Sequence, residues 1–171
     1  MKSKFNEQGE HGPWKITGQN KKTLNILNDL IRINIDRITG YEKAAHAETT
    51  PEPEIRDIFY RMATDSRAYV NTLHAEVLHL GGAPVTQSTI SGKIHLHWLE
   101  GKNSFDGVDT PSRLGASLAA ELAVQKAYEQ ALDEQNHLSP PIHDLVENQS
   151  WGLERSYQRL AVLSESFNQT I

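Results

Sequence analysis

The sequence predicts an all-α protein, a bundle of four long helices in a single domain. Apolar residues recur three and four positions apart through four long stretches, which is the spacing of one face of an α-helix. Proline or glycine clusters separate these stretches, and 171 residues suit one sizeable core better than two. The chain has no cysteine, which excludes disulfides, thiolate zinc sites, iron–sulfur clusters and thiol catalysis.

The first two helices are expected to form an antiparallel pair. The first begins near Lys22 and ends before the proline-containing segment 49–53, and the second covers residues 53–80. Gly81 and Gly82 end the second helix, because glycine is the usual residue after a helix C-terminus. A joint of a few residues makes the two helices antiparallel neighbours. Residues 1–21 are polar and without periodicity, so we expect a mobile tail before a single domain of residues 22–171.

The third and fourth helices are expected to form a second such pair. The third begins near Pro111, capped by Asp109 or Thr110, and the fourth begins at Ser139. Residues 81–110 between the second and third helices can run the full length of the bundle and let the third start at its far end. One such long crossover is the topology of ferritin-like bundles. Within it, residues 90–101 (ISGKIHLHWLEG) are predicted to form a short helix across the bundle.

Polar residues occupy positions where the helix faces should be apolar. Counting from the loops places them in one layer at mid-bundle: Asn34, Asp65, Ser66, Glu121 and Gln149, to which Tyr157 can add a hydroxyl. Burying a carboxylate without a partner is costly, so this layer must be hydrogen-bonded, protonated, metal-bound or hydrated. One interpretation is a hydrogen-bonded layer that sets the helix register, in which Asn34 and Gln149 donate to the carboxylates.

The second interpretation is a metal site derived from the di-iron carboxylate bundles. Those sites take one Glu from each of two helices and Glu-x-x-His from each of the other two. Iron or manganese would be held here by Asp65, Glu121, Glu154 and Glu42. The match is partial, because Ala68 and Tyr157 stand where the two histidines are required. His95 and His97 are interpreted as part of the packed crossover helix, and the two Glu-x-x-His strings ending at His79 and His137 fall at helix C-termini.

These segments together resemble a known family, the bacterial ferritin-like bundles grouped as domain of unknown function 2383. The resemblance is carried by residues 27–31 (LNDLI), 34–44 (NIDRITGYEKA) and 75–82 (AEVLHLGG) with Pro84, by Ser91-Gly-Lys with Trp98, and by Glu121 with Lys126-Ala-Tyr128. It implies a ferritin-like four-helix bundle of the kind found in stress-associated bacterial proteins, with no established activity. Many members carry an acidic residue at the position of Ile38 and a histidine at that of Tyr157, so the resemblance implies an incomplete ligand set here.

The charge and the hydropathy of the chain exclude several classes of function. The net charge is −5 and no basic block occurs, which argues against binding to nucleic acid or to an anionic membrane. No apolar stretch is long enough for a membrane span, so a cytoplasmic location is expected. We expect a structural or interaction protein that forms a homo-oligomer, in the simplest case a dimer. The alternative is a metal-binding bundle with oxidase or peroxide-handling activity.

Overall fold

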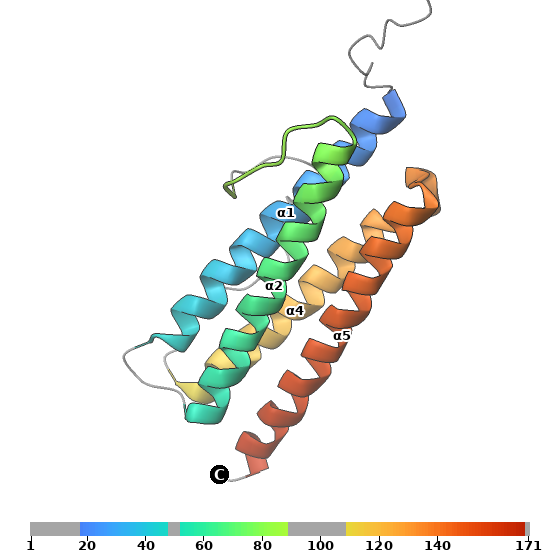
Figure 1. Cartoon of the computed structure of the whole chain (residues 1–171). Coiled ribbons are helices and arrows are strands. Elements are labelled where there is room, and N and C mark those ends of the chain that lie inside the picture. Colours follow the sequence, from blue (N-terminus) through green and yellow to red (C-terminus); the bar gives the residue numbers. More distant parts are fainter. Residues whose placement is uncertain (1–17, 48–51, 89–108, 170–171) are drawn as a thin grey trace, which may run out of the picture.

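The computed structural model describes residues 18–47, 52–88 and 109–169, and these residues form four long helices (Figure 1). The helices are α1 (Gly18–Ala45), α2 (Pro53–His79), α4 (Thr110–Ala131) and α5 (Pro140–Gln169), and a single 3₁₀ turn, η1 (Glu134–Asn136), precedes α5. The predicted all-α class is therefore confirmed, although α1 begins four residues before Lys22, where the apolar periodicity starts. The short helix predicted at residues 90–101 and most of the predicted tail lie outside the described residues.

The helix ends follow from local side-chain chemistry. Asp109 caps α4: its carboxylate accepts a hydrogen bond from the backbone N–H of Ser112 at 2.8 Å, and the Ser112 hydroxyl accepts from the Asp109 N–H at 3.2 Å. After α2, Gly81 adopts a left-handed φ of 76°, which glycine reaches without a steric penalty. The backbone N–H of Gly82 then donates to Val77 at 2.9 Å, so a carbonyl at the end of α2 is satisfied.

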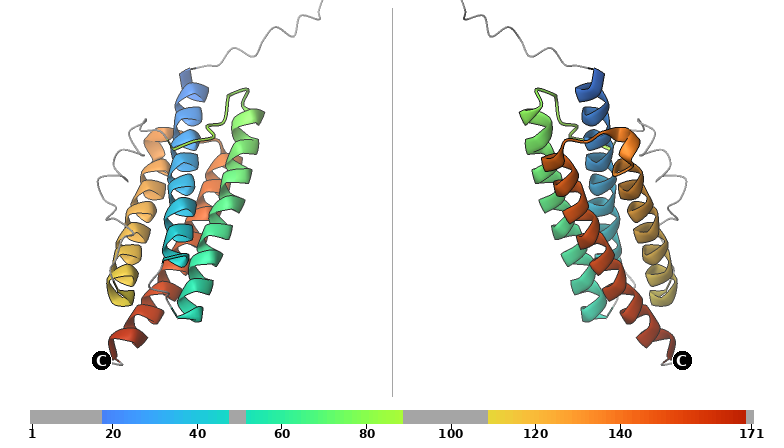
Figure 2. Two further views of the ribbon diagram at one scale, coloured as in Figure 1. Left: turned by 90° about the vertical axis from the view of Figure 1, so that its left-hand side faces the viewer. Right: turned by 90° about the vertical axis from the view of Figure 1, so that its right-hand side faces the viewer.

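Two contacts give the directions of the helices. The Gln19 side chain at the start of α1 donates to the backbone carbonyl of Asn136, just after α4, at 2.8 Å. The Thr110 hydroxyl at the start of α4 donates to the carboxylate of Glu52, just before α2, at 3.5 Å. Helices α2 and α4 therefore run in the same direction, and each is antiparallel to its hairpin partner, α1 or α5. As the two side views show, α2 ends and α4 begins at opposite ends of the bundle (Figure 2).

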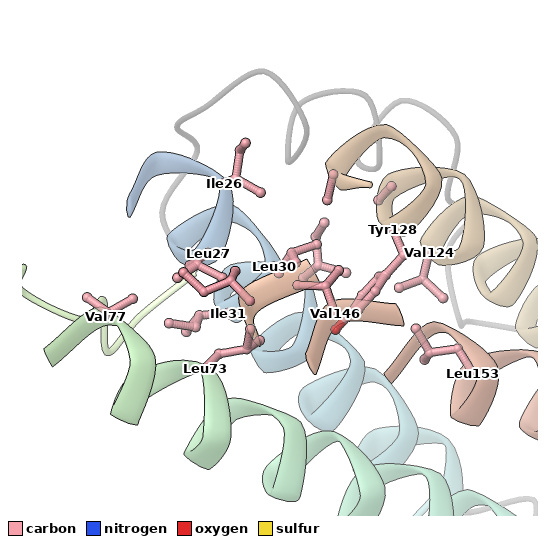
Figure 3. Close-up of a cluster of buried hydrophobic side chains, with 14 of the residues drawn as sticks. Ile26, Leu27, Leu30, Ile31, Leu73, Val77, Val124, Tyr128, Val146 and Leu153 are labelled. Atoms are coloured by element: carbon pink, nitrogen blue, oxygen red, sulfur yellow. The ribbon is translucent and has the colours of Figure 1, made fainter. Parts of the chain in front are cut away.

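The interior contains two apolar clusters. The larger draws on all four helices and includes Leu27, Leu30, Leu73, Val124, Val146 and Leu153 (Figure 3). The second is built around Tyr41, Phe59, Met62, Leu114 and Leu160. Each fully buried aliphatic or aromatic side chain contributes about 1.5–3 kcal/mol relative to an exposed one, so these clusters supply most of the drive to fold. No helix among the described residues has the length and apolarity needed to cross a membrane.

Candidate functional site

A buried ion pair between α1 and α4 lies at the centre of the bundle. The side chains of Arg37 and Glu121 are 1% and 0% exposed. The Nε and Nη2 groups of Arg37 donate to Glu121 Oε1 at 3.0 and 2.9 Å, and Nη2 also donates to Oε2 at 2.9 Å. Both oxygens of the carboxylate are thus held by one guanidinium, the bidentate geometry in which such pairs are strongest.

Three further side chains complete the surroundings of this pair. The Tyr41 hydroxyl donates to Glu121 Oε1 at 2.6 Å. Arg37 Nη1 donates to the Ser66 hydroxyl of α2 at 2.6 Å and, at 3.5 Å, to the side-chain oxygen of Asn34. Ser66 in turn donates to the backbone carbonyl of Met62 at 2.9 Å. The donors of the guanidinium are therefore satisfied in the core, which is the condition for burying a charge at acceptable cost.

The same network continues to α5. Asn34 Nδ2 donates to the hydroxyl of Tyr128 at 2.8 Å, and that hydroxyl donates to Gln149 Oε1 at 2.8 Å. Gln149 Nε2 donates to the hydroxyl of Thr72 in α2 at 2.8 Å. One connected set of hydrogen bonds therefore links all four helices, and sliding any helix along its neighbour by a turn would break it.

The guanidinium of Arg37 stays protonated in this layer. Burial alone would lower the pKa of Arg37, but the negative charge of Glu121, the influence of Tyr41 and the hydrogen bonds to Glu121 outweigh it and raise that pKa. Burial raises the pKa of Tyr41 well above 10, and the charge of Glu121 raises it further. Burial also raises the pKa of Tyr128, against the opposing effect of the hydrogen bond from Asn34. The two phenols are neutral near pH 7.

The structure brings four of the predicted layer residues, Asn34, Ser66, Glu121 and Gln149, into this network. Asp65 and Tyr157 are half-buried, and among the described residues neither is hydrogen-bonded to it. The expected pairing was wrong: Asn34 and Gln149 donate to Tyr128 and Thr72 rather than to Asp65 and Glu121. Tyr128, not Tyr157, supplies the hydroxyl that joins the helices, because it is completely buried whereas Tyr157 lies at the edge of the bundle.

The four carboxylates considered as metal ligands are not gathered in one place. Glu154 is exposed and accepts a hydrogen bond from Gln158, and Glu42 forms an ion pair with Arg67 at the surface. In the part of the chain that the structure describes, one group alone brings three histidine or carboxylate ligand atoms within 4.8 Å of one another. It consists of His143, Asp144 and Glu147, on the first turns of α5, and Asp144 is exposed.

These residues do not fit a di-iron centre. Such a centre needs four carboxylates and two histidines that converge inside the bundle. In the described helices the central layer contributes a single carboxylate, Glu121, and both of its oxygens bind the Arg37 guanidinium. A metal ion at Glu121 would have to displace this guanidinium and would leave two positive charges side by side in the core, which is strongly unfavourable.

Neither Arg37 nor Tyr41 is among the predicted site residues, although α1 contains a signal for them. Asn34, Arg37, Tyr41 and Ala44 continue the three- and four-residue spacing of the buried face. An arginine in that register, at the level of a glutamate on another helix, indicates a buried ion pair.

The comparisons with known proteins agree with this architecture. The family model described as "Domain of unknown function (DUF2383)" matches residues 22–134. Among solved structures, the chain is similar to a dodecameric thioferritin, the bacterioferritin-related protein from Bacteroides fragilis. The TM-score is 0.71 at 17% sequence identity, over 88% of each chain, and at this identity the similarity shows the fold. No curated protein matches the sequence.

Proposed function

The chain belongs to the DUF2383 family, and on that premise we propose that it is a ferritin-like structural or interaction protein, not an enzyme, with an incomplete di-iron-type site. The observation that carries this proposal is the ion pair between Arg37 and Glu121 at the centre of the bundle. Arginine does not lose its proton in proteins, so its guanidinium is a permanent cation at the buried carboxylate of Glu121. The pair gives the layer a structural role, because it locks the register of α1 against α4.

We further propose that the protein acts in the cytoplasm as a homo-oligomer, in the stress-associated setting that the family resemblance implies. The solved structure that the chain resembles is described as dodecameric, which supports self-association of a bundle with this fold. Most soluble oligomers are built from identical subunits with closed symmetry, and two-fold dimers are the commonest among them. A dimer is the simplest assembly consistent with this proposal.

The test is metal loading of the full chain purified without a histidine tag. After incubation with ferrous iron or manganese and removal of the excess, bound metal is measured by elemental analysis and melting is followed by circular dichroism. We expect far less than one ion per chain and an unchanged melting temperature, because no core donor set is free to bind metal. The variant His143→Ala/Glu147→Ala is the control, since it removes the surface group on α5.

The alternative, a metal-binding bundle with oxidase or peroxide-handling activity, predicts a different result. About two ions per chain, retained in the control variant and accompanied by consumption of oxygen or peroxide, would overturn the proposal. Metal that is lost in the control variant comes from the surface group and leaves the proposal standing.

A further inference from the structure

The outer face of α5 carries two large exposed apolar residues. Trp151 is 52% exposed and Val162 is 68% exposed. They lie eleven residues apart, three helical turns, and therefore on the same side of α5. This side borders the groove between α2 and α5, which opens into two hollows of about 630 and 620 Å³ near its two ends. Tryptophan is among the residues most enriched at protein–protein interfaces.

Charged residues of opposite sign lie on either side of Trp151 along this face. Asp144 and Glu147 lie seven and four residues before Trp151, and Arg155 and Arg159 lie four and eight residues after it. Asp144, Arg155 and Arg159 are exposed and line the hollows, with Asp144 at one end of the groove and the arginines at the other. Within the described part of the chain neither arginine forms an ion pair. We call the α5 residues before Trp151 the acidic half of the face and those after it the basic half. The basic half also carries the exposed Glu154, and Glu54 of α2 lines the same hollow as the two arginines.

We propose that this face binds a second copy of the chain, with the two α5 helices antiparallel across a two-fold axis at Trp151. This proposal rests on the self-association proposed above and names its surface. A two-fold axis at Trp151 places the acidic half of one copy on the basic half of the other, about 6 and 10–12 Å along the helix from the tryptophan. Each Trp151 then packs against its counterpart in the partner.

The apolar ends of the face obey the same symmetry. Pro141 lies ten residues before Trp151 and lines one hollow, and Val162 lies eleven residues after it and lines the other. Under the two-fold axis, Val162 of one copy meets Pro141 of the other. An aromatic residue at the centre with complementary charges around it is the usual composition of a specific interface.

The absence of cysteine allows a direct test of this geometry by disulfide trapping in the full chain. The variant Trp151→Cys should form a disulfide-linked dimer on mild oxidation, because the two positions meet on the axis. Asp144→Cys alone should not cross-link, whereas a mixture of Asp144→Cys and Arg159→Cys should. Leu78→Cys is the matched control, since Leu78 is 63% exposed on α2 and lies outside both hollows.

Charge reversal tests the same surface in solution by sedimentation equilibrium. Arg155→Glu/Arg159→Glu should weaken self-association by about tenfold or more, and adding Asp144→Lys/Glu147→Lys to the same chain should restore it. Trp151→Asp should dissociate this contact while the α-helical circular dichroism is retained, and Leu78→Asp should not. A wild-type monomer at high protein concentration, self-cross-linking of Asp144→Cys, or an oligomer indifferent to Trp151→Asp would each overturn the proposal. These results do not depend on metal content, so they test the α5 interface independently of the metal-loading test.

Discussion

Removing either partner of the buried ion pair between Arg37 and Glu121 should destabilise the protein strongly. The two perturbations are Arg37→Met, which keeps an apolar stem in the core, and Glu121→Leu. Arg37→Met leaves Glu121 buried with one hydrogen-bond donor, the Tyr41 hydroxyl. Glu121→Leu leaves the guanidinium with Ser66 and Asn34, two neutral partners. Each variant therefore contains a charge in the core without its counter-charge.

Breaking one side of a buried ion pair costs about 3–5 kcal/mol of unfolding free energy. For a chain of this size, that corresponds to a melting temperature lower by about 6–20 °C. If Glu121 belonged only to a neutral polar layer, Glu121→Leu would be expected to stabilise the bundle; the partnership with Arg37 reverses the sign. Replacing both charges should recover most of the loss, except for about 1–3 kcal/mol from the Tyr41 hydroxyl, which loses its hydrogen bond to the Glu121 carboxylate.

The assay is urea denaturation followed by circular dichroism, applied to the wild type, both single variants, the double variant and the triple variant with Tyr41→Phe. We expect the double variant to be more stable than either single variant, with a coupling energy of at least about 3 kcal/mol, and the triple variant to approach the wild type. Additive effects of less than about 1 kcal/mol from each single substitution would refute the reasoning, because they would mean that the two charges do not depend on each other.

Two other predictions concern close packing and alkaline pH. A Cβ at Gly152 would overlap the hydroxyl of Tyr69 and force that side chain to shift, so Gly152→Ala should cost about 1–3 kcal/mol in urea titrations. Tyr69→Phe should remove this cost. At Gly115 an added Cβ meets nothing within 4 Å, so Gly115→Ala should stabilise the protein by up to about 1 kcal/mol. A cost at Gly115 equal to that at Gly152 would contradict this explanation. The pKa values of Tyr41 and Tyr128 are raised above 10, so stability should be unaffected by these groups below pH 10 and should fall as the pH rises further, when only the unfolded chain ionises. In a tyrosinate absorbance titration the Tyr41 and Tyr128 hydroxyls should ionise only as the protein unfolds. Tyr41→Phe should make the free energy of unfolding fall less steeply with pH. Ionisation of both hydroxyls in the folded protein near pH 10 would contradict this prediction.

The helices could be predicted because their determinants are local. The spacing of Leu27, Ile31 and Asn34 defines a buried face within one helix, and Asp109 or Gly81 marks a boundary within a single turn. Such signals depend on residues a few positions apart, so they can be recognised without knowledge of the fold. The family resemblance had the same basis, since it rested on short contiguous segments such as residues 34–44.

The partners within the layer could not be predicted in the same way. Periodicity placed Asn34, Glu121 and Gln149 inside the bundle, but the angle and rotation at which the helices pack decide which side chains meet. In the packed bundle Arg37 contacts Glu121, 84 positions away in the chain, and Asp65 is only half-buried. The identity of the donor to a buried carboxylate is a property of the packed bundle.

By itself, the sequence determined the class of fold, the helix boundaries to within a few residues, the lack of thiol chemistry and the presence of polar residues in the core. The packing of the four helices, which no local pattern reveals, places the Arg37 guanidinium on the buried carboxylate of Glu121. A helix face depends on residues that are neighbours along the chain. The counter-charge of a buried group must lie within about 3 Å of it, and the packing of the other helices determines which residue that is.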